Sequence, residues 1–164
     1  DDIRDFEIEG MSIGDNMLDF FAEEKIESDK FFFEEQKENK KYASMKYYEN
    51  LENFKSLTFN FIDNNYKIGA ISAFVNIKNI KDCKIKKKEI TDNVSSLFLD
   101  AKSYEYNDPH FLDPSSIVYT SVWHLENGFI RVACYDWSNE SGYPKELRVE
   151  AASKEYALFL ELIN

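Results

Sequence analysis

The dipeptide Asn127-Gly128 stands between two segments in which apolar and polar residues alternate, 116–126 and 129–137. Asn-Gly is the preferred central pair of a type I′ turn, whose twist matches that of paired strands. The pattern therefore predicts an antiparallel hairpin, and the turn sets its register. The predicted facing pairs are Leu125–Ile130, Trp123–Val132 and Ser121–Cys134.

Period-two alternation also occurs at 42–48, 56–62, 66–77 and 145–151, and each of these segments predicts a strand. Asp63-Asn64-Asn65 is a tight-turn signal between the second and third of them, because Asn tolerates the left-handed region. With a two-residue turn at Asn64-Asn65, we expect Phe61 to face Ile68 and Phe59 to face Ala70.

Helical spacing of apolar residues predicts three helices. A first helix follows Ser12 and Asp15, which resemble a capping box, and a short turn is expected at 23–28. The longest helix covers 79–102, and a polar connection, 103–115, follows it. The apolar stripe expected on the long helix is Ile80, Cys83, Ile90, Val94, Leu97, Phe98 and Ala101, and the first helix is expected to use Ile13, Met17, Phe20 and Phe21. Ser153 caps a terminal helix whose inward residues are Tyr156, Phe159, Leu160 and Ile163.

The order of these elements predicts an α+β fold in a single domain, 1–164. We expect a mostly antiparallel sheet built from two three-strand blocks. A long central helix packs on one face, with short N- and C-terminal helices. The chain has no βαβ alternation and no Gly-rich phosphate loop, and no cofactor is expected.

Charge narrows the class of partner. The 164 residues carry a formal net charge of −11, which disfavours nucleic acid, and no apolar run is long enough for a membrane span. Lysines cluster on the long helix, and Lys87 is expected to snorkel at its edge. The cluster is interpreted as a solvated face, with an anionic lipid or polymer as the alternative partner. Its members are Lys78, Lys81, Lys84, Lys86, Lys87 and Lys88.

The two cysteines, Cys83 and Cys134, are each expected on a buried face. If the long helix covers the hairpin face that carries Cys134, the two sulfur atoms point at each other. We therefore expect a disulfide, and two separate buried thiols are the alternative. There is no CxxC pair and no zinc-ligand spacing, so no metal site is predicted.

The chain begins at Asp1 rather than Met, which is compatible with removal of a secretory signal, with a trimmed domain or with a tag scar. Segments 6–15 and 132–138, with the helix around Cys83, resemble a group of small exported proteins of AT-rich marine bacteria that have no known activity. Gly10–Asp15 (GMSIGD) also resembles the start of the outer-membrane-assembly lipoprotein and β-lactamase-inhibitor-protein type of fold. We expect an exported protein, periplasmic or extracellular, with a cytoplasmic location as the alternative.

The second face of the 116–137 hairpin holds many large apolar groups. One interpretation is that helix 13–21 or the Phe31–Phe33 stretch covers them. The other is a binding patch or oligomer interface, since large aromatic residues and Arg are common interface anchors. The candidate binding residues are Phe129, Arg131, Tyr135 and Trp137, with Tyr143 in the bordering loop 137–143.

Nucleophilic catalysis has little support in the sequence. Strand parity places His124 opposite Arg131, on the other face from Cys134, so a Cys–His pair is not expected. The chain has no G-x-S-x-G motif, and its Asp/Asn loops lack EF-hand spacing. The alternative function is a small enzyme with a site between loops 103–115 and 137–143, using His110 and Asp136.

The sequence thus favours a non-catalytic binding or structural module that uses an aromatic sheet face to hold an unknown ligand or protein partner. The oligomeric state is left open between monomer and homodimer.

Overall fold

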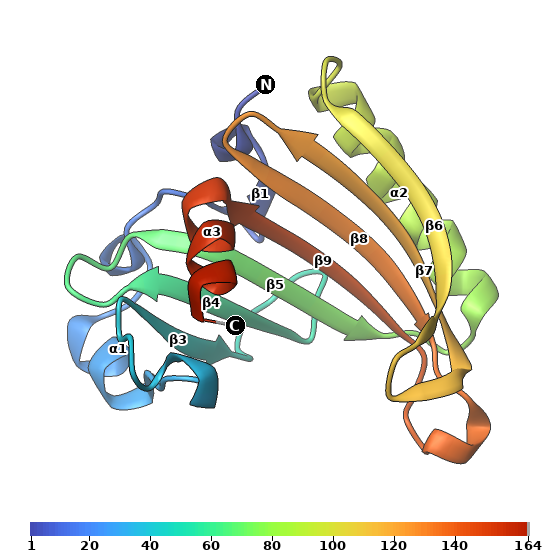
Figure 1. Ribbon diagram of the computed structural model, residues 1–164, viewed down its shortest axis with the longest axis horizontal. Coiled ribbons are helices and arrows are strands. Elements are labelled where there is room, and N and C mark those ends of the chain that lie inside the picture. The colour runs from blue at the N-terminus through green and yellow to red at the C-terminus, as the bar shows by residue number, and fades with distance from the viewer. Residues whose placement is uncertain (164) are drawn as a thin grey trace.

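The computed structural model describes residues 1–163, and the side chain of Ile163 lies outside the described part. In these described residues, the elements form two sheets and three α-helices (Figure 1). The strands are β1 (Glu7–Ile8), β2 (Met11–Ser12), β3 (Tyr42–Tyr47), β4 (Ser56–Ile62), β5 (Ile68–Asn76), β6 (Lys102–His110), β7 (Asp113–Leu125), β8 (Gly128–Asp136) and β9 (Glu146–Ser153). The α-helices are α1 (Glu23–Asp29), α2 (Ile80–Leu97) and α3 (Lys154–Ile163).

The main sheet has seven antiparallel strands in the order β3-β4-β5-β9-β8-β7-β6, which confirms the α+β class. Helix α2 packs on one face, called here the back face, and α3 packs on the other, called the front face (Figure 1). Apolar residues of the back face form the larger core with α2 and the N-terminal segment. None of the helices in residues 1–163 is long and apolar enough to cross a membrane.

The expected two blocks of three strands are a single continuous sheet, because β5 pairs with β9 along seven residues. Four strands, rather than three, follow α2. The additional strand is β6, where a connection was expected at 103–115. Residues 102–109 are all exposed, so this strand lacks the apolar alternation that identifies a half-buried strand.

The prediction of a helix at 13–21 is wrong. A short hairpin, β1–β2, precedes a single 3₁₀ turn at Met17–Asp19. Asp15 does accept a hydrogen bond from the Ser12 backbone N–H at 2.9 Å, but the Ser12 hydroxyl donates to the Phe6 carbonyl instead. The apolar residues of this segment are therefore buried by an irregular chain, and the first α-helix is α1.

The hairpin β7–β8 forms as predicted, but its turn is displaced by one residue. Leu125 pairs with Gly128, so Glu126 and Asn127 occupy the loop, and Trp123 faces Ile130 rather than Val132. Neither Asn127 nor Gly128 has a positive φ. Gly128 is instead required by close packing, since a Cβ there would lie 2.4 Å from the Ala152 carbonyl oxygen. The predicted pairs Leu125–Ile130 and Ser121–Cys134 are wrong for the same reason. Because the register is shifted by two residues, each side chain still lies on its predicted face of the sheet.

A β-bulge changes the register of the β4–β5 hairpin. Phe61 faces Ile68 as predicted, whereas Phe59 faces Ile71 rather than Ala70. The irregularity lies between Asn60 and Phe61, because the extra residue Gly69 is accommodated there. Phe59 and Phe61 are fully buried, so the expected core of this hairpin is present.

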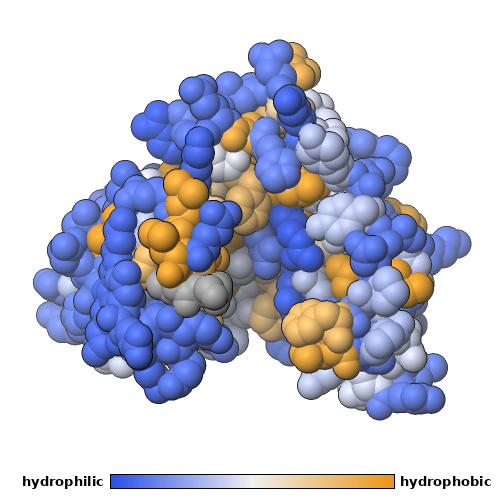
Figure 2. Space-filling model, in the orientation of Figure 1, coloured by the Kyte–Doolittle hydropathy of each residue, from blue (hydrophilic) through white to orange (hydrophobic). Residues whose placement is uncertain are grey.

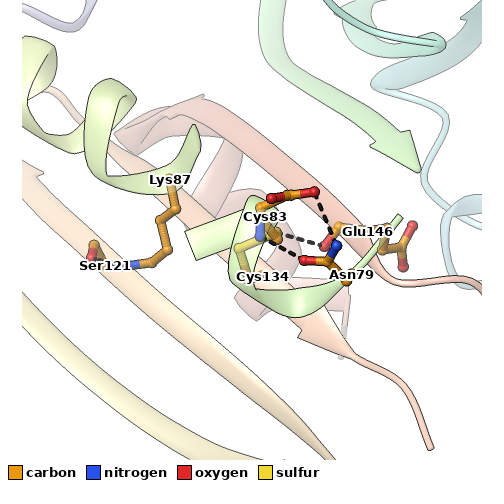
Figure 3. Close-up of a disulfide and its surroundings, with 7 residues drawn as sticks. Asn79, Cys83, Lys87, Ser121, Cys134 and Glu146 are labelled. Atoms are coloured by element: carbon orange, nitrogen blue, oxygen red, sulfur yellow. Dashed lines mark hydrogen bonds between the residues drawn. A yellow bond between two sulfur atoms is a disulfide. The ribbon is translucent and has the colours of Figure 1, made fainter. Parts of the chain in front are cut away.

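Helix α2 is shorter than the predicted 79–102 and carries the disulfide (Figure 3). The Asn79 side chain caps it by accepting from the Asp82 N–H at 2.9 Å. Cys83 and Cys134 are bonded, with 6.0 Å between their Cα atoms, which confirms the expected pairing. Lys87 reaches the Ser121 hydroxyl at 2.5 Å, and burial lowers the pKa of this lysine. Leu97, expected on the buried stripe, is exposed at the end of the helix.

The terminal helix α3 buries Tyr156 and Phe159 against Tyr42, Ala70 and Ala152 of the front face. This is the smaller core that the C-terminal pattern predicted, and the Ile163 prediction lies outside the described side chains. Helix α3 contacts β5, β8 and β9, so it covers one part of the front face. Within residues 1–163, no helix lies over the part formed by β6 and β7 (Figure 1).

Candidate functional site

The candidate binding residues of β8 lie on the front face, but they differ in exposure. Phe129 is half-buried beside α3, where it packs with Ala152 and Tyr156. Tyr135 and Trp137 are buried, with exposed fractions of 5% and 9%, in a small cluster with Ala133. Neither the 13–21 segment nor the Phe31–Phe33 stretch belongs to that cluster, so the expected cover is not what buries them.

Two arginines hold Tyr135 in place. The Arg148 guanidinium lies 4.2 Å from the centre of the Tyr135 ring, and Arg131 donates to the Tyr135 hydroxyl at 3.1 Å. Arg131 also pairs with Glu150 at 3.0 Å. Burial lowers the pKa of Arg131, but Glu150 and Tyr135 more than offset this effect, so the pKa is raised and the group stays charged.

The same network continues to Trp137 through a buried carboxylate. Glu146 is 9% exposed and accepts from the Trp137 indole N–H at 3.1 Å. It also pairs with Arg148 at 2.7 Å. Because charge-assisted hydrogen bonds of this kind are directional, they orient the indole and guanidinium planes. The buried aromatic residues are therefore a fixed floor rather than free anchors.

Beyond Trp137 the floor opens into a pocket of about 860 Å³, called here the distal pocket. It lies between the β6–β7 turn and the chain that leads from β8 to β9. His110 lines it with its ring centre 4.5 Å from that of Trp137, and Tyr143 lies 5.2 Å from Trp137. Its lining also includes Asn76, Asp113, Pro114, Ser138, Glu140, Ser141, Pro144, Glu146 and Arg148.

Three large side chains rim the distal pocket in solvent. Phe111, Leu112 and Tyr143 have exposed fractions of 85%, 76% and 64%. Figure 2 shows apolar atoms gathered at the end of the molecule where β6 meets β7, with the surface hollowed between this half and α3. Such residues cost solvation free energy unless a partner covers them, so this rim is the clearest candidate for contact.

A hydrogen-bonded clip holds the two sides of the distal pocket together. Asp113 accepts from the hydroxyls of Ser116 and Ser138, at 2.5 and 2.6 Å. The Ser138 N–H in turn donates to the Ser116 hydroxyl oxygen at 2.7 Å. The two serine hydrogen bonds hold the pKa of Asp113 below its usual value. The Ser138 side chain also caps the 3₁₀ turn Asn139–Ser141. This wall of the pocket is therefore held by hydrogen bonds between its own residues.

The two residues of the alternative enzyme are not brought together. His110 lines the distal pocket, and its Nδ1 accepts from the Leu112 N–H at 3.2 Å. Asp136 does not line it and pairs with Lys145 at 2.9 Å. Of the three carboxylates that line the pocket, Asp113 and Glu146 are held by other donors, and Glu140 is exposed to solvent. Within residues 1–163, no group of three or more His, Cys, Asp or Glu side chains is arranged to hold a metal ion.

The sequence reasoning missed several residues of this site, among them Phe111, Leu112 and Arg148. The signal for the first two was an apolar dipeptide in a polar stretch between Pro109 and Pro114. Arg148 gave no signal, because its role depends on the pairing of β8 with β9.

Comparison of the chain with protein-family models, with curated proteins and with solved structures found no match.

Proposed function

We propose that the protein is a non-catalytic binding module that holds its ligand or protein partner in the distal pocket, at the end of its aromatic front face. The observation that carries the proposal is the exposed rim of Phe111, Leu112 and Tyr143 above a rigid floor. Ligand sites are commonly concave and apolar, with a few polar groups that set orientation. Here Arg148 and His110 are those polar groups.

The chemistry of the pocket favours a partner group that is aromatic or aliphatic and carries a hydrogen-bond acceptor. The ring or chain would pack on the rim and on Trp137, while the acceptor would face Arg148. Glu146 already pairs with Arg148, which argues against a ligand that carries several negative charges as the main partner. The partner classes that fit are a peptide side chain and a small organic acid or ester.

We also propose that the protein functions outside the cytosol, in the periplasm or extracellularly. The disulfide supports this location, since structural disulfides persist in oxidising compartments and are rare in the cytosol. A binding role in the cell envelope is consistent with this location. The alternative function, an enzyme using His110 and Asp136, has weaker support, because these residues do not converge on one point of the pocket.

The binding role is tested with 1-anilinonaphthalene-8-sulfonate, an aromatic probe whose fluorescence rises in apolar sites. We expect saturable binding to the wild-type protein and at least about tenfold weaker binding to F111S/L112S, because two apolar contacts are lost. The matched control is L99S, since Leu99 is 82% exposed but lies after α2, outside the distal pocket. Equal affinity for the two variants would contradict the proposal.

A further inference from the structure

The two edges of the main sheet differ in whether another described segment bonds to them. At one edge, β3 is bridged by Phe31, whose N–H and carbonyl bond Ser44 at 2.9 and 2.8 Å. At the other edge, β6 pairs with β7 only, and no described strand or bridge lies along its outer side. An open edge of nine residues presents unpaired backbone groups that can pair with another strand.

The register identifies which backbone groups of β6 point outward. A two-residue hairpin loop closes on a hydrogen-bonded pair, here Leu125–Gly128, so the odd-numbered residues of β7 bond to β8. The even-numbered residues of β7 therefore bond to their even-numbered partners in β6. It follows that Ser103, Glu105 and Asn107 direct their N–H and C=O groups away from the sheet. Pro109 has the same parity, as expected for a proline on an edge strand.

The side chains of β6 carry opposite charges near its two ends. Lys102, Tyr104, Tyr106 and Asp108 share one parity and therefore lie on the front face. Tyr104 and Tyr106 are about half exposed. Within the described residues, neither Lys102 nor Asp108 forms an ion pair, so both charges are available to a neighbour.

We propose that two copies of this chain pair antiparallel through β6, with Glu105 on the two-fold axis. In this register Lys102 faces Asp108 of the partner subunit, and Tyr104 faces Tyr106 of the partner subunit. Each of these contacts occurs twice by symmetry. The hydrogen-bonded pairs use the outward groups of Ser103, Glu105 and Asn107, and Pro109 lies outside them. The seven-stranded sheets of the two copies then form one continuous sheet.

A neighbouring register fits less well. A two-fold axis on Tyr106 would place Ser103 against Pro109 of the partner subunit, where the proline has no N–H to donate. It would also place Lys102 against His110 of the partner subunit, so the opposite charges would not meet. The Glu105 register brings two carboxylates together on the back face, but Ser121 donates to Glu105 at 3.0 Å, and Lys87 donates to the same serine hydroxyl.

The test is sedimentation velocity of the whole chain at low ionic strength, up to hundreds of micromolar, because an edge-to-edge contact is small. The wild-type protein is expected to form a dimer. K102D and D108K each place like charges opposite one another, and we expect each to weaken dimerisation on the order of tenfold. The double variant K102D/D108K restores opposite charges and is expected to recover wild-type dimerisation.

Two results would overturn the proposal. One is a wild-type protein that stays monomeric over the whole concentration range. The other is a double variant that dimerises no better than the single variants, which would exclude the Glu105 register. Both substituted residues are exposed, so thermal unfolding of the variants is expected to match the wild type at dilute concentration and to exclude misfolding as the cause. As a further check, N107P removes an outward N–H without removing a bond to β7, and it should also weaken the dimer.

Discussion

Removal of the disulfide between Cys83 and Cys134 is expected to lower the free energy of unfolding by about 4 kcal/mol. The bond joins residues 51 apart in the chain, and the chain-entropy relation for a loop of this size gives an entropy loss of about 14 cal/mol/K in the unfolded state, or about 4 kcal/mol at 25 °C. The assay is equilibrium urea unfolding of oxidised wild type, reduced wild type and C83A/C134A.

The three samples separate cross-linking from packing. Both cysteines are fully buried between α2 and β8, so the double variant also loses contacts of the two sulfur atoms. The difference in the free energy of unfolding between oxidised and reduced wild type measures the cross-link alone. We expect this difference to account for most of the stability that the double variant loses. A difference below about 1 kcal/mol would refute the reasoning, as would two reactive thiols in the denatured, unreduced protein.

Two further substitutions test the local arguments. Because a Cβ at residue 128 would lie 2.4 Å from the Ala152 carbonyl oxygen, G128A should cost about 2–3 kcal/mol in thermal or urea unfolding. It should cost more than G10A, whose added Cβ meets nothing within 4 Å and whose penalty comes from its positive φ alone; the reverse order would contradict the close approach. Asp113 has a lowered pKa, so its carboxylate stabilises the fold above its unfolded pKa, and this contribution is lost as the pH falls through the folded value. The stability difference between wild type and D113N should therefore be constant near neutral pH and shrink below about pH 4, and a difference independent of pH would contradict the clip.

The faces of the strands could be predicted from the sequence because they depend only on parity. The β7–β8 register is shifted by two residues from the expected one, yet every side chain stays on its predicted face. This is why the pairing of Cys83 with Cys134 was predicted correctly from a wrong register. The turn itself was mispredicted because Gly128 serves close packing against β9, which is a tertiary constraint.

Segments without an apolar pattern could not be assigned. Strand β6 is exposed along its length, and it is stabilised by its backbone hydrogen bonds to β7. Because neither of its faces is buried, its sequence does not show the apolar alternation that would predict a strand. The reverse holds for 13–21, where apolar residues at helical spacing are buried without a helix. There, backbone bonds from Gly14 and Met17 to Ile68 and Tyr66 compete with helix formation.

The location of the pocket could be anticipated from the sequence, but its composition could not. The alternative enzyme was expected to have its site between loops 103–115 and 137–143, and the distal pocket lies between these segments. Tyr135 and Trp137 were expected as exposed contacts, whereas both are buried, and of the two only Trp137 lines the distal pocket. Their burial depends on Arg148 and Glu146, which come from a different strand and meet them only through the β8–β9 pairing.

The most direct test of the distal pocket as the binding site is amide chemical-shift mapping with phenylacetate, which combines an aromatic ring with a carboxylate. The probe is added to the isotopically labelled wild-type protein to saturation. We predict saturable shifts concentrated at residues 110–114 and 137–148, with the Trp137 indole N–H among the largest. Shifts centred on another part of the chain, or none that saturate, would contradict the assignment of this pocket as the binding site.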